Sequence, residues 1–235
     1  YGYTISAYGH DYDNGVITTE PTAEIDGIIT YTCKWCKHQD TKTLGKLGDG
    51  EPNIEGSFQK KSWDTVNDLI KTSKEKDTIS IIMNGARTLP ASVLSGIKVK
   101  DISLNLDMEN GIIWKINGTS ITAETPADTD LSVTNTAEYI PAALYSLIST
   151  NQNDFGFHLG RSGAFDFPAV LSVKADASCA GLMANLFWYD AENGILQCIQ
   201  TVTVGGAFER CIPYADFTLS KGQDYFIAFG TESLN

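Results

Sequence analysis

The sequence predicts a mainly β protein: a β-sandwich with short inserted helices, internally duplicated and preceded by a small β-hairpin knuckle that carries a Cys-x-x-Cys motif. The first observation behind this fold class is a series of short segments in which apolar and polar residues alternate, as they do along half-buried strands. Regularly spaced turn signals of this kind are typical of sandwiches. The clearest turn signals are Asn110-Gly111, Asn193-Gly194 and Gly205-Gly206.

The second observation is an internal repeat. Residues 79–97 and 131–148 share an apolar pattern, and Pro90 and Pro141 within them lie 51 residues apart. Each copy reads as a strand, a short helix that starts at the proline, and an alternating pair of strands. A duplicated unit of this kind is expected to bury one face against its copy. The same offset aligns Leu104, Leu106, Met108, Trp114 and Ile116 with Phe155, Phe157, Leu159, Phe165 and Phe167.

The chain divides into two predicted regions. Residues 1–50 are a small β segment with the knuckle, and residues 51–235 are the duplicated module. Glycines and a proline within residues 45–52 predict a linker between them. The elements of the first region are strands at about 15–19 and 27–33, a tight turn at Cys33-Lys34-Trp35-Cys36, and a return strand.

Three helices punctuate the larger region. Ser62 is a good N-cap for a helix over about 63–74, because a serine hydroxyl accepts from the exposed N–H groups of a first turn. The other two helices start at Pro90 and Pro141. The predicted strands are 78–83, 101–107 and 112–117 in the first copy, a second copy from Leu131 to about Pro168, and then 169–175, 182–189, 195–204, 207–212 and 224–229.

The composition limits the class of partner. The chain of 235 residues is 42% hydrophobic, enough for a sizeable core, and its formal net charge is −12. An acidic surface repels nucleic-acid phosphates and anionic lipids, and no apolar run reaches the roughly 18–20 residues of a membrane-spanning helix. We therefore expect no nucleic-acid partner and no membrane insertion. The start at Tyr1, as in a processed piece, and the Thr-, Ser- and Asn-rich composition suit an extracellular protein. We also expect the module to be monomeric.

The sharpest local motif is the pair Cys33 and Cys36. A Cys-x-x-Cys turn is half of a zinc knuckle, and His10 and His38 are available to complete a tetrahedral set. With four protein ligands such a zinc is structural. A local disulfide and free thiols are the alternatives, and a redox role would need a βαβ setting that the pattern does not provide. No other cofactor is required.

The remaining cysteines fit the core. Five cysteines are an odd number, which argues against a closed disulfide framework. Cys198 and Cys211 flank a predicted hairpin, so they are either small buried residues or a disulfide pair. Cys179 reads as a core or loop thiol.

Aromatic side chains near turns are candidate ligand-binding residues. Trp35 lies at the tip of the knuckle, where an exposed ring stacks on a sugar, and Tyr31, Tyr12 and Tyr8 extend such a platform. The alternative is that Trp35 covers the knuckle as a small core.

A second aromatic pair, Trp188 and Tyr189, is adjacent on a predicted strand. Successive side chains point to opposite faces, so one of the two is core and the other is a second candidate platform. Trp63 and Trp114 lie on periodic apolar faces and are predicted core residues.

No motif indicates an enzyme. The chain lacks GxSxG, HExxH, a P-loop and a dinucleotide-binding glycine fingerprint. The three histidines are His10, His38 and His158, and the alternation around His158 places it on a solvated strand face. We expect no catalytic residues.

Two stretches carry a family resemblance. GHDYDNGVITTEPTAEIDGIITYTCKWCKHQDTKTL, residues 9–44, resembles the short repeat GHxW/Y…PTxxxxGxxTYTCxxC of secreted surface proteins of anaerobic gut bacteria. The repeat often has a cysteine where this chain has Ala23. The rest resembles the modules that follow that repeat in dockerin- or scaffold-associated proteins, and the match covers about residues 9–230. The motifs that carry it are Asn84-Gly85, Leu89-Pro90, residues 101–118 and ANLFWYD at 184–190.

The resemblance implies a non-catalytic module of a polysaccharide-degrading apparatus, of the starch-adherence or cellulosome type. We therefore expect a carbohydrate-binding module that binds an insoluble neutral glucan, starch in preference to cellulose, by aromatic stacking. Its partners would be this polysaccharide and other proteins of the surface complex. The alternative is a structural spacer or protein-docking module of a surface scaffold that binds no glycan.

Overall fold

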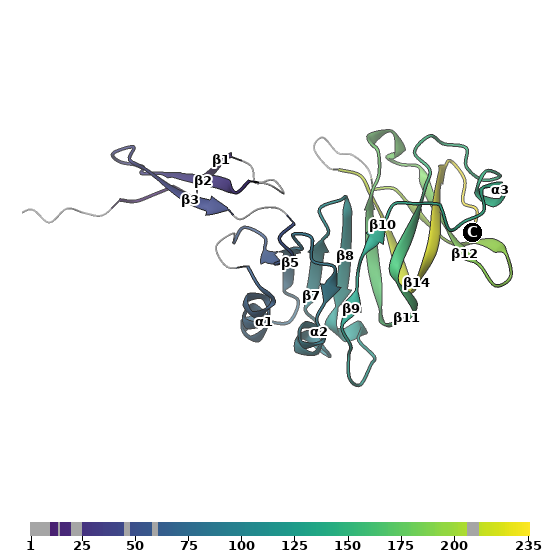
Figure 1. The fold of residues 1–235 in the computed structure, drawn as a ribbon, viewed down its shortest axis with the longest axis horizontal. Helices are drawn as coiled ribbons and strands as arrows, with labels where there is room; N and C mark the ends of the chain where they lie inside the picture. Colours follow the sequence, from purple (N-terminus) through teal and green to yellow (C-terminus); the bar gives the residue numbers. More distant parts are fainter. Residues whose placement is uncertain (1–9, 14, 20–24, 45–47, 58–60, 206–211) are drawn as a thin grey trace, which may run out of the picture.

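The fold is mainly β with short helices, as predicted. The computed structural model describes residues 10–13, 15–19, 25–44, 48–57, 61–205 and 212–235. Their strands form a three-stranded sheet, a nine-stranded sheet and a two-stranded pair (Figure 1). No helix in these ranges is long and apolar enough to cross a membrane.

The three-stranded antiparallel sheet carries the knuckle. Its strands are β1 (Val16–Thr19), β2 (Gly27–Thr32) and β3 (Gln39–Leu44), in that order across the sheet. They confirm the two strands and the return strand expected from the sequence. In Figure 1 this sheet lies at the left, at the end of the molecule opposite α3 (Ala142–Tyr145).

The nine-stranded sheet forms the body. Its order is β13-β12-β14-β11-β8-β7-β5-β4, with β10 also pairing with β11. All neighbours are antiparallel except β5 and β7. The strands are β4 (Asn53–Ile54), β5 (Thr78–Ile82), β7 (Ser103–Asp107), β8 (Ile112–Asn117), β10 (Val133–Thr134), β11 (Phe155–Lys174), β12 (Met183–Asp190), β13 (Ile195–Thr203) and β14 (Tyr214–Gly230).

Two short helices and a separate strand pair share the core of this sheet. The separate pair is β6 (Thr88–Leu89) with β9 (Thr129–Asp130). Helix α1 (Trp63–Thr72) is capped as predicted, since the Thr65 N–H donates to Ser62 Oγ at 3.2 Å. Helix α2 (Ala91–Ile97) follows Pro90, and its Ala91 N–H donates to the Asp128 carboxylate. The 3₁₀ turns are Gly118–Ser120 and Ala177–Cys179.

The two longest strands, β11 and β14, join the halves of the body. Their pairing shifts register between His158 and Gly163 and again between Ala164 and Ala169. β8 pairs with the last part of β11, whereas β12 pairs with the last part of β14. The sequence predicted a sandwich of packed sheets, but these strands form one continuous hydrogen-bonded sheet. Residues from both halves of this sheet pack into one main core. Large, fully buried members of that core include Trp114, Phe157, Phe167, Phe217 and Tyr225.

The two copies of the predicted internal repeat differ in strand topology. In the first copy the strands around the proline helix, β5 and β7, are parallel, whereas in the second copy β10 and β11 are antiparallel. The first copy then turns into a hairpin at Glu109 and Gly111, which both have positive φ. The second copy lacks that Asn-Gly turn and continues as one strand, because β14 runs beside it along its length.

Other boundaries also differ from the sequence expectation. β14 begins at Tyr214, ten residues before the predicted start at 224. Most of the strand predicted at 207–212 lies outside the described residues, and Ile212 is not in a strand. The strand expected at 169–175 is the end of β11.

Substitution of Gly222 tests the junction of β11 and β14. A Cβ at Gly222 would overlap the carbonyl of Arg161, whereas a Cβ at Gly230, on the same strand, meets nothing within 4 Å. We expect Gly222→Ala to lower the free energy of unfolding by about 1–3 kcal/mol or more, because the backbone must shift to admit the methyl. Urea denaturation measures this. Gly230→Ala should leave stability nearly unchanged, and equal effects of the two substitutions would contradict the close approach.

Candidate functional site

Backbone hydrogen bonds fold the knuckle between β2 and β3. The Cys33 N–H donates to the His38 carbonyl at 2.8 Å, and the Lys37 N–H donates to the Cys33 carbonyl at 3.0 Å. Lys37 has a φ of 63°, the left-handed conformation that closes a tight turn. The Cys33-to-Cys36 turn is therefore held by local main-chain contacts.

The residues before β1 run beside this turn. The Lys34 N–H donates to the Asp11 carbonyl at 2.9 Å, and Tyr12 forms an isolated bridge with Cys33. These contacts bring His10 Nδ1 to 3.2 Å from Cys36 Sγ. The ligand atoms of His10, Cys33 and Cys36 all lie within 4.8 Å of one another, so the three residues form a group that can hold a metal ion.

The electrostatics of the knuckle favour a thiolate. The Cys33 side chain is buried, yet its pKa falls from 9.0 to about 6. The largest cause is a hydrogen bond from the Cys36 N–H, with smaller contributions from the Trp35 N–H, His10 and the Cys36 side chain, while desolvation opposes them. A thiolate is the form of cysteine that binds metals.

His38 is not part of this group, contrary to the four-ligand set expected from the sequence. Its ring stacks on the His10 ring, with centroids 4.5 Å apart and planes 15° from parallel. The metal-ligating group among the described residues therefore has three members. Ala23, where the similar repeats often carry a cysteine, lies outside the described residues.

The described cysteines are free thiols, and the structure does not show the alternative Cys33–Cys36 disulfide. Cys179 is buried in the main core, as expected. Cys198 is half-buried on β13, and Cys211 lies outside the described residues, so the possible bond between them stays a prediction.

Trp35 lies at the surface and does not cover the knuckle. Its side chain is 82% exposed, and its Nε1–H donates to Asp11 Oδ2 at 3.4 Å. Lys34 Nζ binds the same carboxylate at 3.2 Å. These two donors, Lys34 first, lower the pKa of Asp11. The indole is thus tethered at its edge while its faces remain open.

The two tyrosines of the predicted platform are half-buried. The Tyr12 ring centroid lies 5.5 Å from that of His10, and Lys42 Nζ lies 5.4 Å from the Tyr31 centroid. Tyr8 lies outside the described residues. Of the three described members of this set, Trp35 therefore has the most open face.

Trp188 and Tyr189 lie on β12, in the other part of the molecule (Figure 1). The Trp188 Nε1–H donates to Gln223 at 2.9 Å, and Lys221 Nζ lies 3.0 Å from the ring centroid. Tyr189 packs on a second small core with Phe187. The predicted binding residues therefore form two separate groups, one at the knuckle and one on β12. The second group has less open aromatic surface, because the Lys221 ammonium already occupies one face of Trp188.

Two other aromatic predictions concern the core. Trp114 is buried and donates to the Leu131 carbonyl at 2.9 Å, as expected of a core indole. Trp63 is half-buried against the same core.

His158 has a partner that the sequence did not reveal. Its Nδ1 lies 2.7 Å from Asp224 Oδ1 on the neighbouring strand β14, and the Tyr139 ring lies against it at 4.5 Å. His158, predicted to lie on a solvated face, therefore belongs to a partly buried cross-strand pair. Residues 66 apart in sequence meet here through strand pairing alone.

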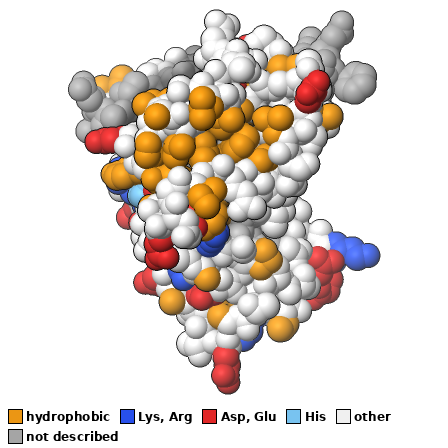
Figure 2. Space-filling view, turned by 90° about the vertical axis from the view of Figure 1, so that its right-hand side faces the viewer, with side chains coloured by type: hydrophobic (Ala, Val, Ile, Leu, Met, Phe, Trp, Pro, Cys, Tyr) orange, Lys and Arg blue, Asp and Glu red, His pale blue; other side chains and the backbone are white. Residues whose placement is uncertain are grey.

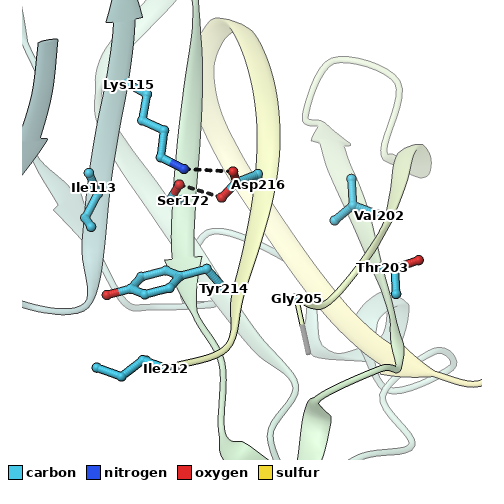
Figure 3. Close-up of a pocket in the computed structure, with 9 residues that line it drawn as sticks. All are labelled: Ile113, Lys115, Ser172, Val202, Thr203, Gly205, Ile212, Tyr214 and Asp216. Carbon is cyan, nitrogen blue, oxygen red and sulfur yellow. Dashed lines mark hydrogen bonds and ion pairs between the residues drawn. The ribbon is translucent and has the colours of Figure 1, made fainter. Parts of the chain in front are cut away.

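The structure also contains a pocket that sequence reasoning missed. It has a volume of about 510 Å³ and lies between the outer face of β8, β11 and β14 and the end of β13 (Figure 3). Lys115, Ser172 and Asp216 meet in it. Alternation within each strand marks these residues as outward-facing, but their convergence depends on the register of three strands.

Comparisons with protein-family models, with curated proteins and with solved structures gave no match.

The ionisation of Cys33 is measurable in metal-free, reduced protein. We expect the ultraviolet absorbance of thiolate to rise with a midpoint near pH 6. Cys33→Ser should remove this step, whereas Cys198→Ser should leave it, because burial raises the pKa of Cys198 above its ordinary value. Since folding lowers the pKa of Cys33, its stabilising effect is present above pH 9 and is lost as the pH falls through about 6. A first thiolate step near pH 9 would contradict the arrangement.

Proposed function

We propose that this chain is a non-catalytic carbohydrate-binding module of a secreted bacterial cell-surface protein, and that it binds an insoluble neutral glucan, starch in preference to cellulose. The observation that carries the proposal is Trp35, which is 82% exposed at the tip of a turn. A flat indole face packs on the apolar C–H face of a sugar ring, while polar groups around it bind hydroxyls. The Asp11–Lys34 ion pair at the indole edge supplies such polar groups.

Charge supports a neutral ligand. A net charge of −12 disfavours polyanionic glycans, but an uncharged glucan does not meet this repulsion. A single exposed indole buries little area, so we expect a single-site dissociation constant in the micromolar range or weaker. The resemblance to starch-adherence and cellulosome modules favours glucans over other neutral polymers.

We also propose that His10, Cys33 and Cys36 hold a structural zinc ion. The fit rests on the donor set, one imidazole and two sulfurs whose ligand atoms lie within 4.8 Å of one another, and on the low pKa of Cys33. A small sheet with few buried apolar residues gains stability from such a bond network. The ion would fix the turn that presents Trp35, and three protein ligands would leave its fourth position to water or to a further side chain.

One observation favours the alternative function, a spacer or protein-docking module. Figure 2 shows a broad apolar area at the end of the molecule near α3. A second small core lies under α3, β12 and β13, and large apolar side chains around it are exposed. Apolar patches of this kind mark protein–protein contacts. The exposed side chains that adjoin members of this small core in sequence are Tyr139, next to Ile140, and Leu147, next to Ile148.

The zinc proposal is tested by metal analysis of the protein after exchange into zinc-containing buffer and removal of excess ion. We expect one zinc ion per chain, lost in Cys33→Ser and in Cys36→Ser and retained in Cys198→Ser. A loss in His38→Ala would assign His38 as the fourth ligand. Zinc-free wild-type protein whose mass is lower by two hydrogen atoms would instead establish a disulfide.

The glycan proposal is tested by affinity electrophoresis in gels containing starch, soluble cellulose derivative or xylan. We expect starch to retard the wild-type protein most. Trp35→Ala should weaken binding about tenfold, which corresponds to about 1.4 kcal/mol of lost stacking. Leu147→Ala is the matched control, because Leu147 is 79% exposed near α3 and far from the knuckle in sequence. Absence of retardation in every gel would favour the spacer or docking module.

A further inference from the structure

The pocket on the outer face of the nine-stranded sheet has the size and the polar groups of a ligand-binding site. Its volume of about 510 Å³ lies within the range of about 300–1,000 Å³ that is typical of small-molecule sites. Strands β8, β11 and β14 provide one side, and the end of β13 provides the other (Figure 3). The residues that line it include Ile113, Lys115, Ser172, Val202, Tyr214 and Asp216.

A fixed charge pair lies in this pocket. Lys115 Nζ lies 2.8 Å from Asp216 Oδ2, and Ser172 Oγ donates to the other carboxylate oxygen at 2.5 Å. Ser172 is 1% exposed, whereas the Lys115 and Asp216 side chains are 39% and 49% exposed. The buried hydroxyl thus orients a carboxylate that still faces solvent together with its ammonium partner.

Apolar surface lies next to this pair. Figure 3 shows the Tyr214 ring extending from β14 past Ser172 towards Ile113, with Val202 on the opposite side of the pocket. Burial raises the pKa of Tyr214, and the charge of Asp107 raises it further, so the phenol stays neutral. A planar ring beside a donor and an acceptor is a common arrangement in sites that bind small polar molecules with one apolar face.

The charge pair selects the class of ligand. An anion would be repelled by Asp216 and a cation by Lys115, so the pair as a whole favours a neutral group. Two adjacent hydroxyls match it, because one donates to the carboxylate while the other accepts from the ammonium. Hydrogen bonds to charged groups are roughly twice as strong as those between neutral groups.

We propose that this pocket is a binding subsite for one pyranose residue of a neutral polysaccharide. Asp216 and Lys115 bind two vicinal hydroxyls of the sugar, Ser172 holds the carboxylate in place, and the Tyr214 ring contacts the apolar face of the pyranose. This inference rests on the proposed function. The subsite belongs to the nine-stranded sheet and Trp35 to the three-stranded sheet, so the two contacts can be removed separately.

The experiment uses the whole chain, with methyl-labelled isoleucine and valine. Maltoheptaose and a cello-oligosaccharide are titrated separately, and the methyl signals of Ile113 and Val202 are followed by NMR. We expect these signals to shift saturably with at least one of the two sugars. In affinity gels, the double variant Lys115→Met/Asp216→Asn should bind about tenfold more weakly. The amide that replaces the carboxylate in this variant keeps an oxygen that accepts from Ser172.

The matched control is Lys71→Met/Asp68→Asn on α1, which removes an exposed ion pair of the same 2.8 Å length. It should bind like the wild-type protein. Wild-type retardation without methyl shifts, or with an undiminished double variant, would overturn the subsite and leave the proposed function standing. Absence of both retardation and shifts would overturn the two together. Should the double variant fail to fold, the methyl shifts of the wild-type protein decide the matter.

Discussion

The pairing of β11 with β14 is the constraint on which the body of this protein depends. Every other strand of the nine-stranded sheet is connected to the rest through one of these two. Their register breaks bring Gly163 opposite Gly222, where the backbone of β11 approaches too closely for a side chain. Because one hydrogen-bonded pair reaches both halves, Trp114 of β8 and Leu186 of β12 belong to one core.

The same pairing fixes the chemistry of the outer face. Inner residues of the central strands are apolar, so the outer residues are free to be polar, and the register decides which of them meet. Ser172 lies opposite Asp216 on β14 and Ile113 on β8. The Asp216 carboxylate thereby gains the buried Ser172 hydroxyl and the Lys115 ammonium as partners. These three side chains form the candidate sugar subsite.

The geometry of the knuckle, in contrast, depends mostly on contacts between residues close in sequence. Main-chain hydrogen bonds within residues 33–38 shape the turn, and a few residues before β1 add His10 and the Asp11 carboxylate. The pKa of the buried Cys33 thiol is lowered mainly by hydrogen bonds from main-chain amides of the turn itself. A small sheet can therefore present one exposed indole in a defined orientation without a large core, above all when a metal ion joins its strands.

The sequence by itself determined the class of fold, the Ser62 cap, the Asn-Gly hairpin after β7 and the Cys-x-x-Cys turn, because these depend on residues within a few positions of one another. It did not predict that β11 continues through its second half, because the partner β14 lies far along the chain. The repeated apolar pattern suggested a repeated topology, yet pairing partners gave one copy a parallel strand and the other an antiparallel one. Only the tertiary structure decided that His38 stacks beside the metal-ligating group, that Lys221 covers Trp188, and that Lys115 meets Asp216, since each depends on side-chain packing or strand register.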